Sequence, residues 1–252
     1  LVMALLSANA QKRAFTIEDL YRVKGVSSVS LSPDGKTVCY TASSSDLKNQ
    51  KSGSDIYIMN ADGSYTKALT EDGKSSSAVW SKDGKSIFFT NYEKGTAQIF
   101  RMDLTTCETE QVTDYELGIG SPVISPDERY IAFTAEVYPD LGADAKANKA
   151  RMEKKEQGPV QAHIADKLLY RHWTSYNDGR CNHLILFDTQ TKTYKDLTPG
   201  NYSLIFVVGG GITYQFSPDS KEICFVSNHD EHQEASTNAD LWTVSVNGGE
   251  PV

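Results

Sequence analysis

The stretch LSPDGKTVCYTA, residues 31–42, combines a tight turn with a strand, and the chain repeats this combination three more times. Pro33 fixes φ at the second turn position, Asp34 accepts hydrogen bonds from nearby backbone amides, and Gly35 permits positive φ. The other copies are VWSKDGKSIFFTN (79–91), VISPDERYIAFTA (123–135) and QFSPDSKEICFVSN (215–228). Because Glu128 and Ser220 replace the glycine in two copies, we expect the turn to vary there.

Each copy is followed by a second pair of strands, so the repeating unit has four. These pairs cover residues 55–70, 98–113, 183–198 and 240–252, each as a strand, a polar turn and another strand. Apolar residues such as Ile87-Phe88-Phe89 occupy both faces of the central strands, which is typical of sheets covered on both sides. A four-stranded unit of about 40–50 residues is a propeller blade, which buries its faces only by stacking on neighbours.

The repeat predicts an all-β fold, a partial β-propeller of about four four-stranded blades from a larger ring. The blades are expected near residues 26–70, 76–113, 120–198 and 210–252, within an N-terminal propeller part that covers residues 11–252. The last strand of the earlier copies ends on Leu-Thr or Val-Thr, and by alignment Val252 falls about three residues before that point. In addition, complete propeller rings usually have about 6–8 blades. We therefore expect the chain to be an N-terminal fragment of a longer protein.

The third unit carries an insertion, expected at residues 137–180 between its second and third strands, because the turns at Ser125 and Ser217 are separated by 92 positions. AKANKARMEKKE within it favours helix, which Gly158-Pro159 ends. Residues 160–173 are predicted to form a second amphipathic segment, with Val160, Ile164, Leu168 or Leu169, and Trp173 on one face.

The N-terminus begins with six apolar residues followed by Ala8-Asn9-Ala10. Small residues at these positions fit a signal-peptidase site, so residues 1–10 are interpreted as a signal-peptide remnant and the protein as exported, to the periplasm or outside the cell. The alternative is a frayed apolar end. Residues 16–23 predict a short helix with Thr16 as its N-cap.

Composition excludes several classes of function. The net charge of −8 gives no basic footprint for nucleic acid, and no other apolar run approaches the length of a membrane span. Cys39 and Cys224 occupy the same repeat position, which a small buried residue explains, and no Cys-x-x-Cys occurs. The disulfide status and the oligomeric state, including a homo-oligomer, stay open.

A cluster of polar and aromatic residues after the predicted helix is the candidate substrate-binding site. Its members are Arg171, His172, Trp173, Tyr176 and Asp178, with Arg180 and His183 close by in sequence. Arginine binds carboxylates and aspartate binds amines, so the cluster suits the two ends of a short peptide. The alternative is structural, with Trp173 and Tyr176 as packing residues and Asp178-Gly179 as a turn.

No catalytic, metal or cofactor site is predicted. His229-Asp230-Glu231-His232 lies in a polar loop with no helical face to align ligands. Gly209-Gly210-Gly211 precedes a strand rather than a helix, which excludes a nucleotide-binding loop. No Gly-x-Ser-x-Gly occurs, so the nucleophile elbow of a hydrolase is missing from these residues.

The repeats, the N-terminus and the segment YRHWTSYNDGRCNHLILFD (170–188) together resemble the N-terminal propeller of secreted serine peptidases of the prolyl oligopeptidase family. The similarity is greatest to the acylaminoacyl-peptidase-like and dipeptidyl peptidase V-like branch and covers residues 15–252. The resemblance implies a seven- or eight-bladed propeller that admits short peptides to a C-terminal α/β-hydrolase domain of the same parent chain.

The resemblance also implies a Glu-Glu pair that holds the amine of the substrate in related dipeptidyl peptidases. This sequence has no Glu-Glu dipeptide. Glu136, Asp140 and Asp178 are the acidic residues that remain as substitutes. The expected function is therefore a substrate-gating segment of an exported dipeptidyl or acylaminoacyl peptidase. The alternatives are a non-enzymatic, TolB-like propeller that binds a protein partner and, with less support, a propeller with its own hydrolytic site such as a glycosidase.

Overall fold

The structure is a computed structural model that describes residues 13–160, 162–165, 168, 170–204 and 213–252. Within these residues the chain forms seventeen β-strands, two α-helices and one 3₁₀-helix. The predicted signal-peptide remnant, the three consecutive glycines and Leu169 lie outside the described residues. None of the described helices has the length and apolar character needed to cross a membrane.

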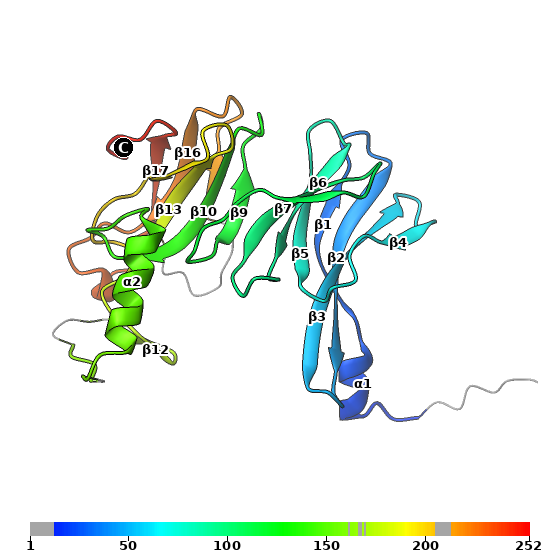
Figure 1. Ribbon diagram of the computed structural model, residues 1–252, viewed down its shortest axis with the longest axis horizontal. Helices are drawn as coiled ribbons and strands as arrows, with labels where there is room; N and C mark the ends of the chain where they lie inside the picture. Colours follow the sequence, from blue (N-terminus) through cyan, green and yellow to red (C-terminus); the bar gives the residue numbers. More distant parts are fainter. Residues whose placement is uncertain (1–12, 161, 166–167, 169, 205–212) are drawn as a thin grey trace, which may run out of the picture.

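Four antiparallel sheets follow one another along the chain (Figure 1). The first sheet consists of β1 (Gly25–Leu31), β2 (Thr37–Asp46), β3 (Lys51–Asn60) and β4 (Thr66–Ala68). The second consists of β5 (Ser75–Trp80), β6 (Ser86–Asn91), β7 (Gln98–Asp103) and β8 (Thr109–Gln111). The third consists of β9 (Gly120–Ile124), β10 (Tyr130–Val137), β13 (Cys181–Asp188) and β14 (Thr193–Asp196).

The fourth sheet has three described strands, β15 (Tyr214–Phe216), β16 (Glu222–Ser227) and β17 (Asp240–Ser245). Val252 exchanges two backbone hydrogen bonds with Thr243 of β17, of 2.8 and 3.0 Å, at the edge where the other sheets have their fourth strand. The structure thus confirms the predicted partial β-propeller and the helical insertion in its third unit.

The turn between the first two strands has the same hydrogen bonds in all four sheets. In the first sheet, the Ser32 hydroxyl donates to Asp34 over 2.7 Å and accepts from the Thr37 amide over 2.9 Å, and the Lys36 amide donates to Asp34. The hydrogen bonds of the Ser32 hydroxyl and the Lys36 amide lower the pKa of Asp34. The turns that begin at Ser81, Ser125 and Ser217 repeat these contacts.

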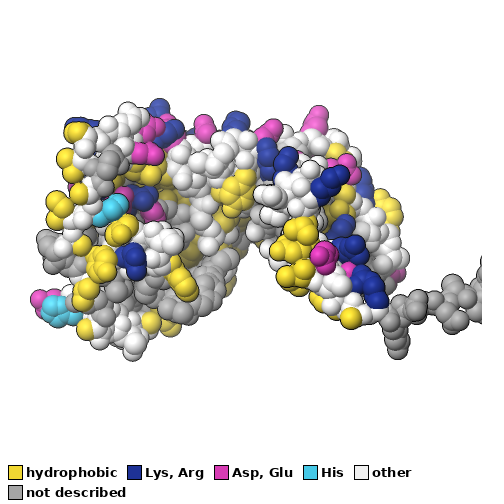
Figure 2. Space-filling view, turned by 90° about the horizontal axis from the view of Figure 1, so that it is seen from below, with side chains coloured by type: hydrophobic (Ala, Val, Ile, Leu, Met, Phe, Trp, Pro, Cys, Tyr) yellow, Lys and Arg dark blue, Asp and Glu magenta, His cyan; other side chains and the backbone are white. Residues whose placement is uncertain are grey.

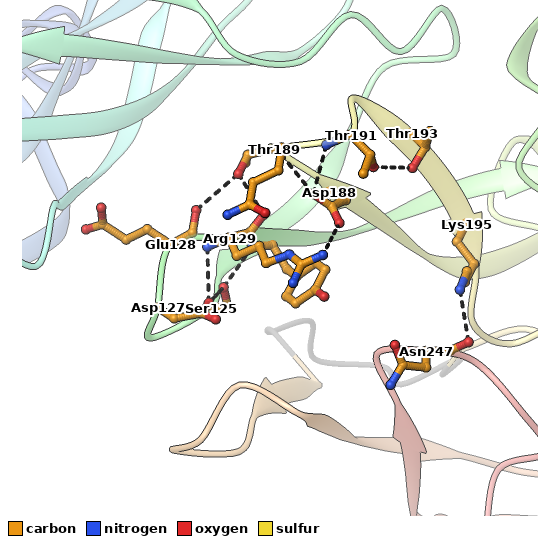
Figure 3. Close-up of polar contacts among 12 residues, drawn as sticks. Ser125, Asp127, Glu128, Arg129, Asp188, Thr189, Thr191, Thr193, Lys195 and Asn247 are labelled. Atoms are coloured by element: carbon orange, nitrogen blue, oxygen red, sulfur yellow. Dashed lines mark hydrogen bonds and ion pairs between the residues drawn. The ribbon is translucent and has the colours of Figure 1, made fainter.

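The expectation that the turn varies without glycine is wrong. Gly35 and Gly84 have φ of 72° and 70°, and Glu128 and Ser220 adopt 62° at the same position. The serine and aspartate contacts hold the turn together in each copy, and they outweigh the backbone preference of a single residue. Figure 3 shows the turn of the third sheet, in which Ser125, Asp127 and Arg129 are joined by these bonds.

The core lies between the sheets, as three apolar clusters. Along β6, Ile87 and Phe89 face the first sheet while Phe88 faces the third. Along β10, Ile131 and Phe133 face the second sheet while Ala132 faces the fourth. Successive side chains of a strand point to opposite faces, so each central strand contributes to two clusters at once. Cys39 is a free thiol buried in the cluster between the first and second sheets, in agreement with a packing role.

The connections of the sheets emerge on two opposite faces. The serine-aspartate turns lie on one, which we call the turn face. On the other, the insertion face, the β2–β3 hairpin, the helix α1 (Ile17–Arg22) and the helix α2 (Ala145–Glu156) project in the same direction (Figure 1). Figure 2 shows the molecule from this side as an arch that is hollowed along one edge, as expected for part of a ring.

The predicted N-terminal helix is confirmed. The side chain of Asp19 accepts from the Thr16 amide over 2.9 Å and from the Thr16 hydroxyl over 3.2 Å, which satisfies the start of α1. Asp19 also pairs with Arg13 and Arg22. These contacts lower the pKa of Asp19, and the hydrogen bond from Arg13 contributes most.

Candidate functional site

The insertion leaves the third sheet between β10 and β13 and returns directly beside its starting point. Val137 and Cys181 are paired residues of these two strands, so the segment between them is a closed excursion on the insertion face. It contains α2 and a small hairpin of β11 (Arg171–His172) and β12 (Ser175–Tyr176). Because both ends are fixed by the sheet, the remaining contacts decide where α2 lies.

The helix α2 has local signals for its start and its end. Asp144 caps the first turn by accepting from the Ala147 amide over 3.0 Å, and Lys154 and Lys155 lie in the last turn, where cations favour the helix dipole. Gln157 is the C-cap, and Gly158-Pro159 follows. The helix is mostly polar and has no continuous apolar face. Asn148 is its buried residue, and Ala145 in its first turn packs against the core cluster between the second and third sheets.

Asn148 fastens α2 to the end of β10 through its amide group. The side chain is fully buried, its oxygen accepts from the Tyr138 amide over 2.7 Å, and its nitrogen donates to the carbonyls of Gly142 (3.0 Å) and Asp144 (2.8 Å). All three of these bonds connect the helix to the chain that precedes it. The first turn of α2 therefore has a defined position relative to the third sheet.

Two arginines lie between α2 and the ends of the insertion: Arg151 belongs to α2, and Arg180 donates to the Sδ of Met152 in α2 over 3.8 Å. Arg151 makes two hydrogen bonds of 2.7 Å to Asp140, and its guanidinium lies 4.7 Å from the ring centre of Tyr138. The Arg151 bonds lower the pKa of Asp140. Arg180, next to β13, lies 3.0 Å from Asp178 and 3.1 Å from Glu136. In this way both arginines contribute to the geometry of the insertion.

The three acidic candidates for binding a substrate amine are therefore already paired. Glu136 and Asp178 share Arg180, and Asp140 is held by Arg151. Lys155 in addition donates to the backbone carbonyl of Asp178 over 2.7 Å. Each of these carboxylates is thus partly neutralised by an arginine, which weakens its attraction for an incoming ammonium group.

The structure brings part of the predicted substrate-binding cluster together. Arg171 pairs with Tyr176 across the β11–β12 hairpin, and the backbone of His172 pairs with Ser175. Trp173 lies in the turn of the hairpin with a φ of 46° and is 81% exposed. The ring of Tyr176 stacks on His163 at 4.0 Å. Asp178 is separate from this group because it faces Arg180.

The predicted amphipathic helix over residues 160–173 is wrong for the described residues, which form no helix before β11. The residues of the predicted apolar face are open to solvent: Val160 is 69% exposed, Ile164 is 90% exposed and Leu168 is 65% exposed. A short helix needs an apolar surface to pack against, and the described chain offers none at this place.

His183 is a member of the sheet rather than of the site. It is fully buried in β13, its Nδ1 lies 2.7 Å from Asp196, and its Nε2 lies 2.9 Å from the Gly200 carbonyl. Both partners only accept, so both ring nitrogens carry protons. Burial alone would lower the pKa of His183, but the hydrogen bond to Asp196 and the further contacts raise it to about 9. The position of His183 in the sequence, close to the candidate cluster, did not indicate this buried contact with Asp196.

The polar loop after β16 places His229 between two aromatic rings. The ring centres of Tyr202 and Trp242 lie 3.9 and 4.0 Å from that of His229, and burial lowers the pKa of His229. The described residues contain no group of three His, Cys, Asp or Glu side chains arranged to hold a metal ion.

Comparison with known proteins identifies the fold family. The family model described as "TolB beta propeller domain" matches residues 12–157, more than half of the chain. The chain belongs to this family. A second model, the "Dipeptidyl peptidase IV (DPP IV) N-terminal region", matches residues 142–252, which include α2 and the hairpin of the insertion.

Two bacterial peptidases are among the curated relatives of this propeller chain. Dipeptidyl-peptidase 5 of Porphyromonas gingivalis is 30% identical over 231 residues, which cover 89% of this chain and 33% of the relative. The uncharacterized peptidase YuxL of Bacillus subtilis is 25% identical over 234 residues, which cover 92% and 34%. The chain thus spans about a third of the length of the relatives that it matches.

Solved structures share the fold. An acylaminoacyl peptidase of Pyrococcus horikoshii has a TM-score of 0.64 at 18% identity, over 92% of this chain and 32% of that protein. TolB of Acinetobacter baumannii has a TM-score of 0.53 at 20% identity, over 88% and 41%. At these identities the likeness establishes the propeller fold.

Proposed function

We propose that this chain is the substrate-gating propeller segment of an exported serine peptidase that cleaves short peptides, of the dipeptidyl or acylaminoacyl class. The catalytic α/β-hydrolase domain would belong to the same parent protein, outside this chain. The observation that carries the proposal is the alignment with dipeptidyl-peptidase 5 over 89% of the chain. The proposal needs no metal or organic cofactor, because a serine hydrolase works with side chains alone.

In this proposal the insertion helps to decide which peptides pass. The helix α2 is attached through Asn148 and Arg151 and contacts Arg180 through Met152, so it offers a defined edge, whereas the β11–β12 hairpin carries exposed groups. The residues proposed to contact the peptide are Arg171, His172, Trp173, Tyr176 and Asp178. Trp173 and Tyr176 are the exposed aromatic surfaces of this set.

The activity is tested on the purified full-length protein. We expect it to release 4-nitroaniline from dipeptidyl or acylaminoacyl 4-nitroanilides, to leave folded proteins intact, and to lose activity after reaction with a fluorophosphonate that labels serine hydrolases. Absence of turnover on both substrate classes, with no labelling, would contradict the proposal and favour the binding function below. Export is tested by locating the full-length protein in the periplasmic or extracellular fraction.

The gating role is tested by removing the insertion. Because Val137 and Cys181 are paired, residues 138–180 can be replaced by Asn-Gly, which closes a two-residue hairpin. We expect the variant to fold and to cleave a different range of peptide lengths, with activity on the smallest substrate retained. An unchanged length range would show that the insertion does not select substrates.

A matched control shortens another hairpin on the same face. Ser45 pairs with Ser52, and Asp46 with Lys51, so deleting these two pairs shortens the β2–β3 hairpin while keeping the Ser44–Gly53 pair and the loop residues 47–50. We expect this variant to keep the substrate range of the wild-type protein. An equal change in both variants would indicate a general loss of structure at this face instead of selection by the insertion.

The second candidate function is a non-enzymatic propeller that binds a protein partner, as the match to the TolB family model over residues 12–157 permits. If the chain is a binding propeller, we expect the fluorophosphonate to label no serine in the full-length protein. We also expect the full-length protein to be isolated in a stable complex with its partner. The fluorophosphonate experiment distinguishes the two functions directly.

A further inference from the structure

Neighbouring sheets touch through their serine-aspartate turns on the turn face, and the fourth turn residue makes each contact. Glu128 of the third sheet accepts the backbone N–H of Lys82 in the turn of the second sheet. The Ser220 hydroxyl of the fourth sheet accepts the N–H of Asp127 in the third over 3.1 Å. A Cβ added to Gly84 of the second sheet would lie 3.5 Å from the Pro33 ring in the first.

The chemistry of the two partners matches at each of these three contacts. Pro33 has no N–H to donate, and Gly84 opposite it has no side chain to accept. Lys82, at the same turn position as Pro33, has an N–H, and the long side chain of Glu128 reaches it. In the third sheet that position is Pro126, so the first available donor is the N–H of Asp127, which the short side chain of Ser220 reaches.

The two side chains occupy an unfavourable backbone conformation to make these contacts. Both Glu128 and Ser220 have φ of 62°, where glycine is accommodated without strain and other residues are disfavoured. Figure 3 shows that the Glu128 side chain points away from Arg129, Asp188 and Thr189, toward the neighbouring sheet. Both contacts between sheets are therefore made from a backbone conformation that glycine would adopt with less strain.

We propose that the fourth turn residue determines the joining of adjacent sheets, by matching the backbone donor that the preceding turn leaves available. We call this pairing the turn-to-turn contact. Glycine serves where the preceding turn offers proline, and an acceptor side chain of suitable length serves where it offers an N–H. The contact adds a directional requirement to apolar packing between the sheets, which by itself tolerates sliding because it is non-directional.

The first test measures hydrogen exchange of the Lys82 amide in the full-length protein. Glu128→Gly removes the acceptor, and Glu128→Asn shortens its side chain by one methylene group while asparagine still tolerates positive φ. We expect both to raise the exchange rate of this amide roughly tenfold, as expected for the loss of one hydrogen bond to a charged group. Glu128→Gln keeps an acceptor oxygen at the same reach and is expected to stay within about threefold of wild type. Equal exchange in all four proteins would overturn the proposal.

The second test is a thermodynamic cycle with Lys82→Pro, a residue that the equivalent position already carries in the other three turns. On backbone grounds alone, Glu128→Gly relieves strain and raises the melting temperature. We expect it instead to lower the melting temperature by roughly 2 °C in the wild-type protein. In the Lys82→Pro background there is no N–H to lose, so the same substitution is expected to raise it. A change of the same sign in both backgrounds would overturn the proposal.

Discussion

At the scale of single residues, the structure assigns clear roles to two residues that the repeat pattern did not explain, Glu128 and His183. The sequence predicted the turn from serine, proline, aspartate and glycine, and the hydrogen bonds of Ser32 and Asp34 confirm it. It did not predict that Glu128 would keep the same backbone, which the Ser125 and Asp127 hydrogen bonds hold, or that its side chain would reach another sheet. His183 is a similar case, since its two partners lie on β14 and on the segment that follows it.

The His183 ion pair predicts a pH dependence of folding. The pKa of His183 is about 9 in the folded protein and about 6.5 in the unfolded chain, so the imidazolium stabilises the fold fully below about pH 6.5. This stabilisation is lost as the pH rises toward 9, with roughly 3 kcal/mol as an upper bound. Urea unfolding between pH 6 and 9.5 measures it. His183→Gln should remove this dependence, whereas the exposed substitution His163→Gln should leave it in place.

At the scale of elements, local signals predicted the helices well where they did not need a partner. The segment AKANKARMEKKE forms α2 and the helix ends before Gly158-Pro159, as expected, while its N-cap Asp144 was not predicted. The amphipathic pattern over residues 160–173 failed because periodicity describes a face without providing a surface to cover it. Asn148 gave no sequence signal, since an asparagine within a charged helix is expected to face solvent.

Asn148 is predicted to control the attachment of α2. Asn148→Ala leaves the Tyr138 amide and the Gly142 carbonyl without this partner, whereas the Asp144 carbonyl keeps the backbone N–H of residue 148. We expect the start of α2 to detach at a local cost of about 2–3 kcal/mol. Hydrogen exchange at Tyr138 and limited trypsin cleavage after Lys149 measure the detachment. Asn148→Asp keeps an acceptor for the Tyr138 amide but places a carboxylate oxygen against the carbonyls of Gly142 and Asp144, so we expect it to lose protection at Tyr138 as well. Unchanged protection in Asn148→Ala would contradict the prediction.

At the scale of the whole molecule, the sheets depend on one another because their central strands serve two clusters. Phe133 of the third sheet packs with Phe88 and Ile99 of the second, and the adjacent Ala132 belongs to the cluster of the fourth. A single sheet of this kind would leave large apolar surfaces in water. Stability is therefore shared between neighbours along the arch.

This sharing makes the effect of a core substitution extend across the boundary between sheets. Phe133→Ala, at a fully buried position, is expected to cost about 3–5 kcal/mol and to raise hydrogen exchange in β7 of the second sheet. Phe225→Ala is the matched control, because Phe225 packs between the third and fourth sheets. It should affect β16 and leave β7 protected. Loss of protection confined to the third sheet in Phe133→Ala would argue against shared stability.

The sequence by itself determined the unit, its turn, the number of sheets and the place of the insertion, because these follow from contacts between residues close in the chain. The residues of the candidate cluster lie within the insertion, but the sequence did not show which of them lie together. Arg171 and Tyr176 meet across a hairpin, whereas Asp178 is held by Arg180, and Glu136 is drawn to the same arginine from the end of β10.

Only the tertiary structure decided which charges are satisfied and which aromatic groups are open to solvent. Pairing of Arg180 with Glu136, burial of His183 beside Asp196, and the reach of Glu128 to Lys82 all join residues that are 13 to 46 positions apart. Such contacts depend on how strands are arranged in space, and a local pattern carries no information about them.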